Sequence, residues 1–257
     1  MQSAKKWVQT VRSKPKRPDL IEELLPDGNE FMLLAGRTGI GKTNLVLQIA
    51  YCLATGTPFF GLKCTKTVVG YIGFEGTDSK LADRLEKIGA NFPDPAGYLR
   101  FQHDTPFILS NKLDYFRKSV PGCRVVILDP LRYLVGRDYC KPKDAVAFLG
   151  MLQNELAKLK LTAIICHHIK KPNPNLIIEP GDIYDLKGAT EYVDAATSVL
   201  ILERKRQGHK PGGGFARVES DLVTLHFAKT RDAVGELQPI DLKLNRDKLL
   251  FEEVIKT

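Results

Sequence analysis

The sequence predicts an α/β fold, in which a mostly parallel sheet carries helices on both faces and has an antiparallel C-terminal extension. Up to about residue 190, short segments that are apolar throughout alternate with segments whose apolar residues recur at helical spacing. Strands that are apolar on both sides are typical of a parallel sheet covered on both faces. After residue 190, strand-like segments follow one another with turns and no long helices between them. This change of pattern favours antiparallel pairing.

Each element has its own local signal. Apolar runs predict four strands in the first part, at residues 31–35, 67–74, 123–128 and 162–166. Helical spacing predicts three helices, over residues 44–54, around Leu81, Leu85 and Ile88, and over residues 146–159. The later strands are expected at residues 198–202, 222–228, 240–244 and 248–252.

Length and composition indicate one domain. At 257 residues with 43% hydrophobic content, the chain can bury one substantial core. We expect a single domain over residues 1–257, with a basic N-terminal arm at 1–20 and the core at 21–257. No apolar run approaches the ~18 residues that span a bilayer, and the N-terminal residues lack the apolar stretch of a secretory signal. We therefore expect a cytoplasmic protein without a membrane partner.

One segment fits the phosphate-binding pattern G-x-x-x-x-G-K-[ST] without a mismatch, between a predicted strand and a predicted helix. Its residues are Gly36, Arg37, Thr38, Gly39, Ile40, Gly41, Lys42 and Thr43, and Asn44 follows them in the helix. The glycines let backbone N–H groups turn toward phosphates at the helix N-terminus. Lys42 would reach the β- and γ-phosphates, and Thr43 would offer its hydroxyl to Mg²⁺. The sequence therefore predicts a site for ATP and Mg²⁺; a chance glycine-rich turn is the alternative.

Polar residues follow three of the predicted strands, at the edge where an open parallel sheet binds its ligands. Asp129 fits the carboxylate that holds Mg²⁺; its alternative role is to begin a turn at Pro130. Glu75 fits a base that polarises water for attack on the γ-phosphate, or an acid favoured by the dipole of the next helix. One of His167 and His168 would sense the γ-phosphate, unless both only satisfy backbone carbonyls.

The order of phosphate loop, strand-terminal Glu, Asp and His-His, then residues 187–196 and a new strand, resembles the RecA-like ATPases. Within them the chain looks closest to the RepA-type hexameric replicative helicases of plasmids and phages, over about residues 20–250. The resemblance implies a RecA-like P-loop NTPase core that assembles as a ring, with each nucleotide held between neighbouring subunits. By position, Glu75 would be the catalytic base, Asp129 would serve Mg²⁺ and His168 would be the γ-phosphate sensor.

This family also has a basic pair near the end of a late strand, which reaches into the site of the next subunit. Lys229-Thr230-Arg231 matches this pair. A cation supplied in trans neutralises charge on the transferred phosphoryl group and can raise the rate by roughly 10³ to 10⁵. The family often has Asn between the two cations and Gly soon after them, whereas this chain has Thr230 and a later Gly235. An ordinary solvated basic turn is the alternative.

The same resemblance implies DNA contacts on the two loops after the Asp129 and His168 strands. The cations are Arg132, Arg137, Lys141 and Lys143 in the first loop, which also has Tyr133 and Tyr139, and Lys170, Lys171 and Lys187 in the second. Cations with aromatic surfaces suit a sequence-tolerant binder of single-stranded DNA, and the formal net charge of +8 favours polyanionic partners. The second loop also contains Glu179, Asp182 and Asp185, and solvated loops without a DNA role are the alternative.

Three functions are compatible with these residues. The first is an ATP-driven motor that forms a ring, with a hexamer expected, on single-stranded DNA as a replicative helicase. The second is a RecA-like recombination or repair ATPase, which would form open filaments. The third is an ATP-dependent assembly switch without motor activity, and Glu75 argues against it because a switch has less need of a water-activating carboxylate. A small-molecule kinase fits less well, since no arginine-rich insertion separates the later strands.

Overall fold

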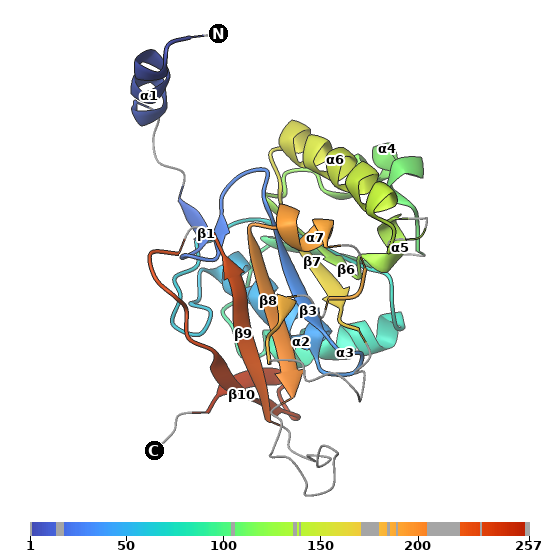
Figure 1. Ribbon diagram of the computed structural model, residues 1–257. Coiled ribbons are helices and arrows are strands. Elements are labelled where there is room, and N and C mark those ends of the chain that lie inside the picture. The colour runs from blue at the N-terminus through green and yellow to red at the C-terminus, as the bar shows by residue number, and fades with distance from the viewer. Residues whose placement is uncertain are drawn as a thin grey trace, which may run out of the picture.

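A nine-stranded sheet forms the centre of the described part of the chain (Figure 1). The computed structural model describes residues 2–13, 18–103, 106–135, 138, 140–170, 180–183, 186–188, 190–204, 222–231 and 233–254. The strand order in the sheet is β11-β10-β9-β8-β3-β7-β6-β4-β5. A separate two-stranded sheet is made of β1 (Asp19–Ile21) and β2 (Leu25–Pro26).

Six neighbouring strands of the large sheet pair in parallel and the remaining three are antiparallel. The parallel strands are β3 (Phe31–Gly36), β4 (Val69–Gly73), β5 (Leu99–His103), β6 (Val125–Asp129), β7 (Thr162–His168) and β8 (Ser198–Arg204). The antiparallel strands are β9 (Leu222–Thr230), β10 (Ile240–Asn245) and β11 (Leu250–Glu253). The fold class predicted from the sequence is therefore confirmed.

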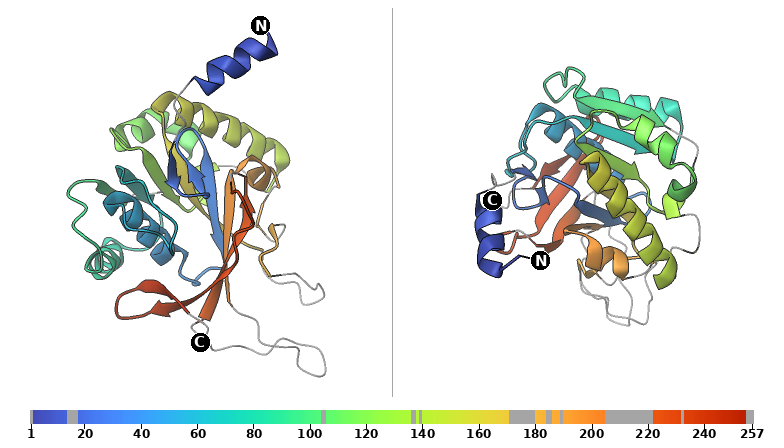
Figure 2. Two further views of the ribbon diagram at one scale, coloured as in Figure 1. Left: turned by 90° about the vertical axis from the view of Figure 1, so that its left-hand side faces the viewer. Right: turned by 90° about the horizontal axis from the view of Figure 1, so that it is seen from above.

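Helices cover both faces of the sheet, as the side and top views show (Figure 2). One face is covered by α2 (Lys42–Thr55) and α3 (Asp78–Gly89). The other is covered by α4 (Leu113–Ser119), α5 (Arg132–Val135), α6 (Pro142–Leu159) and α7 (Glu191–Ala195), with a 3₁₀ turn, η1 (Leu109–Asn111). Within β3, Met32 and Leu34 belong to the first apolar cluster, whereas Leu33 and Ala35 belong to the second. Side chains alternate along a strand, so the unbroken apolar run supplies both faces.

Several elements differ from the sequence-based expectation. The last strand begins at Leu250 rather than at residue 248, because residues 246–249 form the hairpin turn and Leu249 has a φ of 54°. The short strand β5 was not predicted, since it is only partly buried and lacks an unbroken apolar run. Helix α4, with seven residues, is too short to show a clear period.

The N-terminal arm is helical for part of its length. Helix α1 (Ala4–Arg12) begins after Ser3, whose side chain accepts a hydrogen bond from the N–H of Lys6. All of its residues are exposed, and it stands apart from the body of the molecule (Figure 1). Among the described residues, no helix has both the length and the apolar character needed to cross a membrane.

Candidate nucleotide site

The phosphate loop lies between the end of β3 and the start of α2, as its pattern predicts. Gly39 and Gly41 have φ values of +77° and +104°, a backbone conformation that residues other than glycine rarely adopt. A Cβ at position 41 would also come within 2.7 Å of the ring of Phe251. Gly41 caps α2 without a side-chain hydrogen bond, so N–H groups of the first turn of α2 can donate hydrogen bonds to an anion.

The ammonium group of Lys42 is hydrogen-bonded to the backbone of the phosphate loop. Its Nζ donates to the carbonyls of Gly36 at 2.9 Å and Arg37 at 3.0 Å, and it lies 3.4 Å from Nδ1 of His168. Burial lowers the pKa of Lys42, an effect that the charge of Asp129, among others, opposes. A bound phosphate would offer this ammonium group an anionic acceptor in place of two carbonyls.

Thr43 and Asp129 form the oxygen pair expected of a Mg²⁺ site. The Thr43 hydroxyl donates to Asp129 at 2.8 Å, and the Tyr71 hydroxyl donates to the same carboxylate at 3.1 Å. Burial raises the pKa of Asp129, while the hydrogen bonds from Thr43 and Tyr71 lower it. The described residues contain no cluster of three or more His, Cys, Asp or Glu that could hold a metal by themselves. One carboxylate and one hydroxyl fit Mg²⁺, which usually keeps several waters and completes its shell with substrate phosphates.

The two strand-terminal histidines have different surroundings. His168 lies beside Lys42, and burial, followed by the charge of Lys42, lowers its pKa to about 4. Its Nε2 is buried without a partner among the described residues, as is Nε of Arg37. His167 instead contacts the carbonyl of Lys187 through Nε2 and packs against the ring of Tyr192. The structure thus brings His168, not His167, next to the loop, and two unsatisfied nitrogens there suit a ligand rich in acceptor oxygens.

Glu75 lies just beyond the end of β4 and is held by an ion pair. Its Oε1 is 2.5 Å from Nη2 of Arg132, the first residue of α5. The two side chains are 42% and 43% exposed. The charges of Glu75 and Arg132 both act on the pKa values of Lys42 and His168, so the pair lies close to these two side chains.

Lys229 and Arg231 lie far from their own phosphate loop. Thr230 pairs with Ser198 at the start of β8, whereas Gly36 pairs with Leu202 near its end. Four residues of strand separate the two levels, about 13 Å at the usual rise. Lys229 donates to the carbonyls of Val193 at 2.6 Å and Asp194 at 3.0 Å, and Arg231 also donates to Asp194.

Comparison with known proteins matches residues 3–174 to the AAA domain family. The matched range includes the phosphate loop, Glu75, Asp129 and His168. The chain belongs to this family. A solved structure of the KaiC-like protein PH0186 from the hyperthermophilic archaeon Pyrococcus horikoshii OT3 has a TM-score of 0.61 and 16% identity, covering 93% of this chain and 100% of that one. A second solved structure, that of an ATPase domain, has a TM-score of 0.64 and 14% identity, covering 99% of this chain and 100% of that one.

These structures show that the chain has the RecA-like P-loop ATPase fold. A search of curated protein sequences gives no match. Both solved structures differ widely from this chain in sequence, so they establish its fold alone. The chemistry rests on the residues of the site itself.

Some of the cations predicted to bind DNA lie outside the residues that the structure describes. Arg137 and Lys171 lie outside them, as do Tyr139, Glu179 and Asp185. Lys141 and Lys143 are exposed at the start of α6. Lys170 and Lys187 are exposed at the two ends of the second loop, where the N–H of Lys187 donates to the carbonyl of His168 at 2.8 Å. The described part of each loop is therefore attached to a strand that supplies the nucleotide site.

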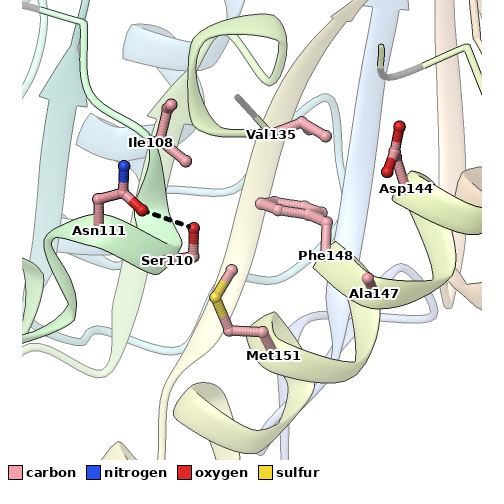
Figure 3. A pocket seen from close by; sticks show the side chains of 8 residues that line it. All are labelled: Ile108, Ser110, Asn111, Val135, Asp144, Ala147, Phe148 and Met151. Atoms are coloured by element: carbon pink, nitrogen blue, oxygen red, sulfur yellow. Dashed lines mark hydrogen bonds between the residues drawn. The ribbon is translucent and has the colours of Figure 1, made fainter. Parts of the chain in front are cut away.

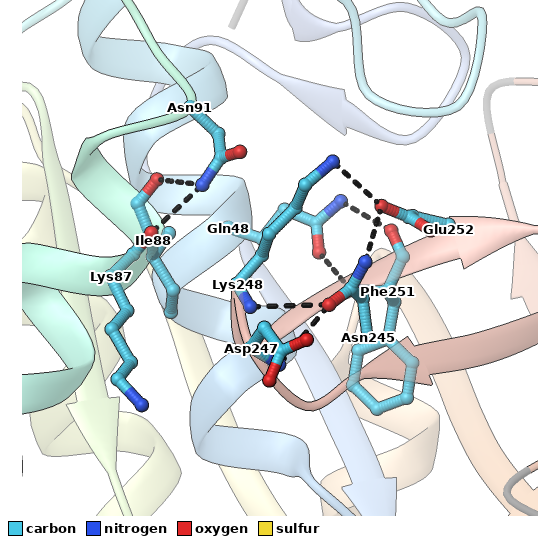
Figure 4. Close-up of polar contacts among 9 residues, drawn as sticks. All are labelled: Gln48, Lys87, Ile88, Asn91, Asn245, Asp247, Lys248, Phe251 and Glu252. Carbon is cyan, nitrogen blue, oxygen red and sulfur yellow. Dashed lines mark hydrogen bonds and ion pairs between the residues drawn. The ribbon is translucent and has the colours of Figure 1, made fainter.

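Sequence reasoning missed the C-terminal support of the phosphate loop. The hairpin of β10 and β11 packs against α2. There Nε2 of Gln48 donates to the carbonyl of Phe251, and Oε1 of Gln48 accepts from the N–H of Phe251, both at 3.0 Å (Figure 4). Gln48 and Phe251 are 8% and 2% exposed. The single available signal was a glutamine within an otherwise buried apolar helix, because a buried amide needs partners.

A groove of about 470 Å³ lies between η1 and α6, on the face of the sheet opposite to α2 (Figure 3). It is lined by Ile108, Ser110, Asn111, Val135, Asp144, Ala147, Phe148 and Met151. This lining contains no cation, so the groove does not fit a nucleotide phosphate.

Proposed function

We propose that this chain is an ATP-hydrolysing motor that forms a ring on single-stranded DNA, as a replicative helicase of the RepA type. The observation that supports it most is the continuity between the two kinds of site. The strand that ends at Asp129 leads directly to Arg132, and the strand that ends at His168 leads directly to Lys170. A change in the nucleotide site therefore has a short path to each cationic loop.

Each side chain of the site has a task in hydrolysis. Lys42 and the N-terminus of α2 bind the phosphates, and His168, neutral at physiological pH, contacts the γ-phosphate through a ring nitrogen. Thr43 and Asp129 would hold Mg²⁺, which would neutralise charge on the transferred phosphoryl group. Glu75 orients the attacking water and takes its proton.

The position of Lys229 and Arg231 supports a shared site. They are too far along β9 to reach the phosphate loop of their own chain, so they serve catalysis only by reaching the nucleotide of a neighbour. The exposed apolar residues of α1, Trp7, Val8 and Val11, also suit a surface that becomes covered on assembly. Both features favour self-association, for which we propose a hexameric ring.

The test combines turnover with imaging. ATP hydrolysis is measured with and without a single-stranded oligonucleotide at low salt, and the protein is viewed by electron microscopy with an ATP analogue and the same oligonucleotide. Rings, DNA-stimulated hydrolysis and unwinding of a forked duplex are expected. Filaments would favour the recombination ATPase instead. Hydrolysis that DNA neither binds nor changes would leave the assembly switch as the better assignment.

A further inference from the structure

We propose that Arg132 keeps Glu75 in an unproductive ion pair until a DNA phosphate takes Arg132 away. Arg132 is then a positioning residue, and single-stranded DNA is the ligand that frees the general base. The inference rests on the proposed function, because it concerns the same hydrolytic site, and it adds a reason for hydrolysis to depend on DNA.

The geometry brings the base and the loop together through two neighbouring contacts. Beside the ion pair, the ring of Phe74 packs against the ring of Tyr133 with centroids 6.4 Å apart. The N–H of Phe74 donates to the carbonyl of Asp129 at 2.9 Å, which ties the end of β4 to the end of β6. Glu75 and Arg132 therefore face each other from two fixed backbones.

Only side chains need to move for the pair to open. Leu134 and Val135 are buried and anchor α5, whereas Arg132 is 43% exposed. The guanidinium lies over the Tyr133 ring, 4.5 Å from its centroid, and also contacts the Tyr133 hydroxyl. A DNA backbone arriving at this loop would find the cation at the surface, already beside an aromatic ring on which a base can stack.

The strength of the pair suits a switch. Ion pairs between exposed side chains are worth little, so the closed form is favoured by a factor of about 5 at most. A phosphate accepts from Arg in a two-pronged geometry and releases counterions from the DNA. Binding of DNA at this cation therefore outcompetes a partly solvated carboxylate.

Once free, Glu75 can act on water. The water oxygen bonds to the γ-phosphorus, the bond from that phosphorus to the bridging oxygen breaks and leaves ADP, and the water proton passes to Glu75. While Oε1 of Glu75 accepts from Arg132, the ion pair holds the carboxylate toward the guanidinium and away from the attacking water.

The decisive variant is Arg132→Gln, which removes the charge and keeps a long polar side chain. The matched control is Lys63→Gln, which breaks the exposed Lys63–Glu22 pair, 3.9 Å long with side chains 84% and 44% exposed, beside the two-stranded sheet. At saturating ATP without DNA, Arg132→Gln should raise kcat two- to fivefold, in line with the factor of about 5 above, and Lys63→Gln should leave kcat unchanged. DNA should add little further stimulation to Arg132→Gln. The double variant with Glu75→Gln should be as inactive as Glu75→Gln alone.

Wild-type protein gives a second measurement that needs no variant. Salt screens exposed ion pairs, so its DNA-free kcat should rise with ionic strength, and the kcat of Arg132→Gln should not. If wild type is stimulated by DNA but Arg132→Gln keeps the wild-type basal kcat or falls below it, the switch is wrong and the motor assignment stands. If wild type hydrolyses no ATP or ignores DNA, the proposed function itself fails.

Discussion

The ring of Phe251 lies against Gly41, and both backbone groups of Phe251 are hydrogen-bonded to the side chain of Gln48. Gln48 and Phe251, 203 positions apart, thus connect the helix that follows the phosphate loop with the last strand of the sheet. The phosphate loop is supported from behind by the C-terminal hairpin, and its shape should depend on that hairpin.

Substitution Gln48→Leu should weaken MgATP binding. It leaves the N–H and C=O of Phe251 buried without partners, which costs about 1–3 kcal/mol, and the hairpin then shifts away from Gly41. We expect about a tenfold higher Kd by calorimetry, equivalent to ~1.4 kcal/mol. The control is Leu242→Ala, which removes a buried side chain from the same hairpin in β10. Both variants should melt earlier, and an unchanged Kd in Gln48→Leu would show that the hairpin only stabilises the fold.

Substitution Glu75→Gln should preserve ATP binding and abolish most turnover. The amide keeps the size of the side chain but cannot take a proton from water, a loss worth about 10²- to 10⁴-fold in rate. Single-turnover hydrolysis and calorimetry measure the two effects separately. Glu86→Gln on the exposed side of α3 is the matched control. Near-normal hydrolysis by Glu75→Gln would remove Glu75 from the mechanism.

Two inactive proteins should restore activity when mixed. Lys42→Ala loses the ammonium that binds phosphate, while Arg231→Ala keeps the loop and loses the cation offered to the neighbour. Interfaces that pair the loop of the Arg231→Ala subunit with the Arg231 of the Lys42→Ala subunit are complete, so the mixture should hydrolyse ATP. Subunit exchange is verified with labelled protein. A mixture that exchanges and stays inactive at every ratio would place Arg231 outside the site.

Acid should destabilise the protein through His167. Burial is the main cause that lowers its pKa from 6.5 to about 4 in the folded state, so the unfolded state binds more protons between these values. The free energy of unfolding should therefore be highest above pH 6.5 and fall as the pH drops toward 4, by about 3 kcal/mol for this residue. Urea unfolding at several pH values measures it. His167→Gln, which can still donate to the Lys187 carbonyl, should remove the part of this slope that His167 causes and leave the part that His168 causes, since the pKa of His168 is also lowered to about 4. An unchanged slope would show that His167 does not contribute.

Much of the site was predictable because its signals are local or follow from sheet topology. Thr43 and Asp129 are 86 residues apart, yet each follows an apolar strand, and parallel strands end at one edge. The Glu75–Arg132 pair and the Gln48–Phe251 contact were not predictable. The first depends on side-chain conformation, and the second depends on how far the antiparallel extension curls around α2. Helix α1 was not predictable either, because none of its residues is buried against another element.

The exposure of α1 has an experimental consequence. Trp7 is the single tryptophan of the chain, and 56% of it is exposed, on a helix that stands apart from the core. Its emission therefore reports on the surroundings of α1, with no tryptophan in the core to obscure it. A shift of the Trp7 emission to shorter wavelength would therefore show when α1 becomes covered, independently of nucleotide turnover.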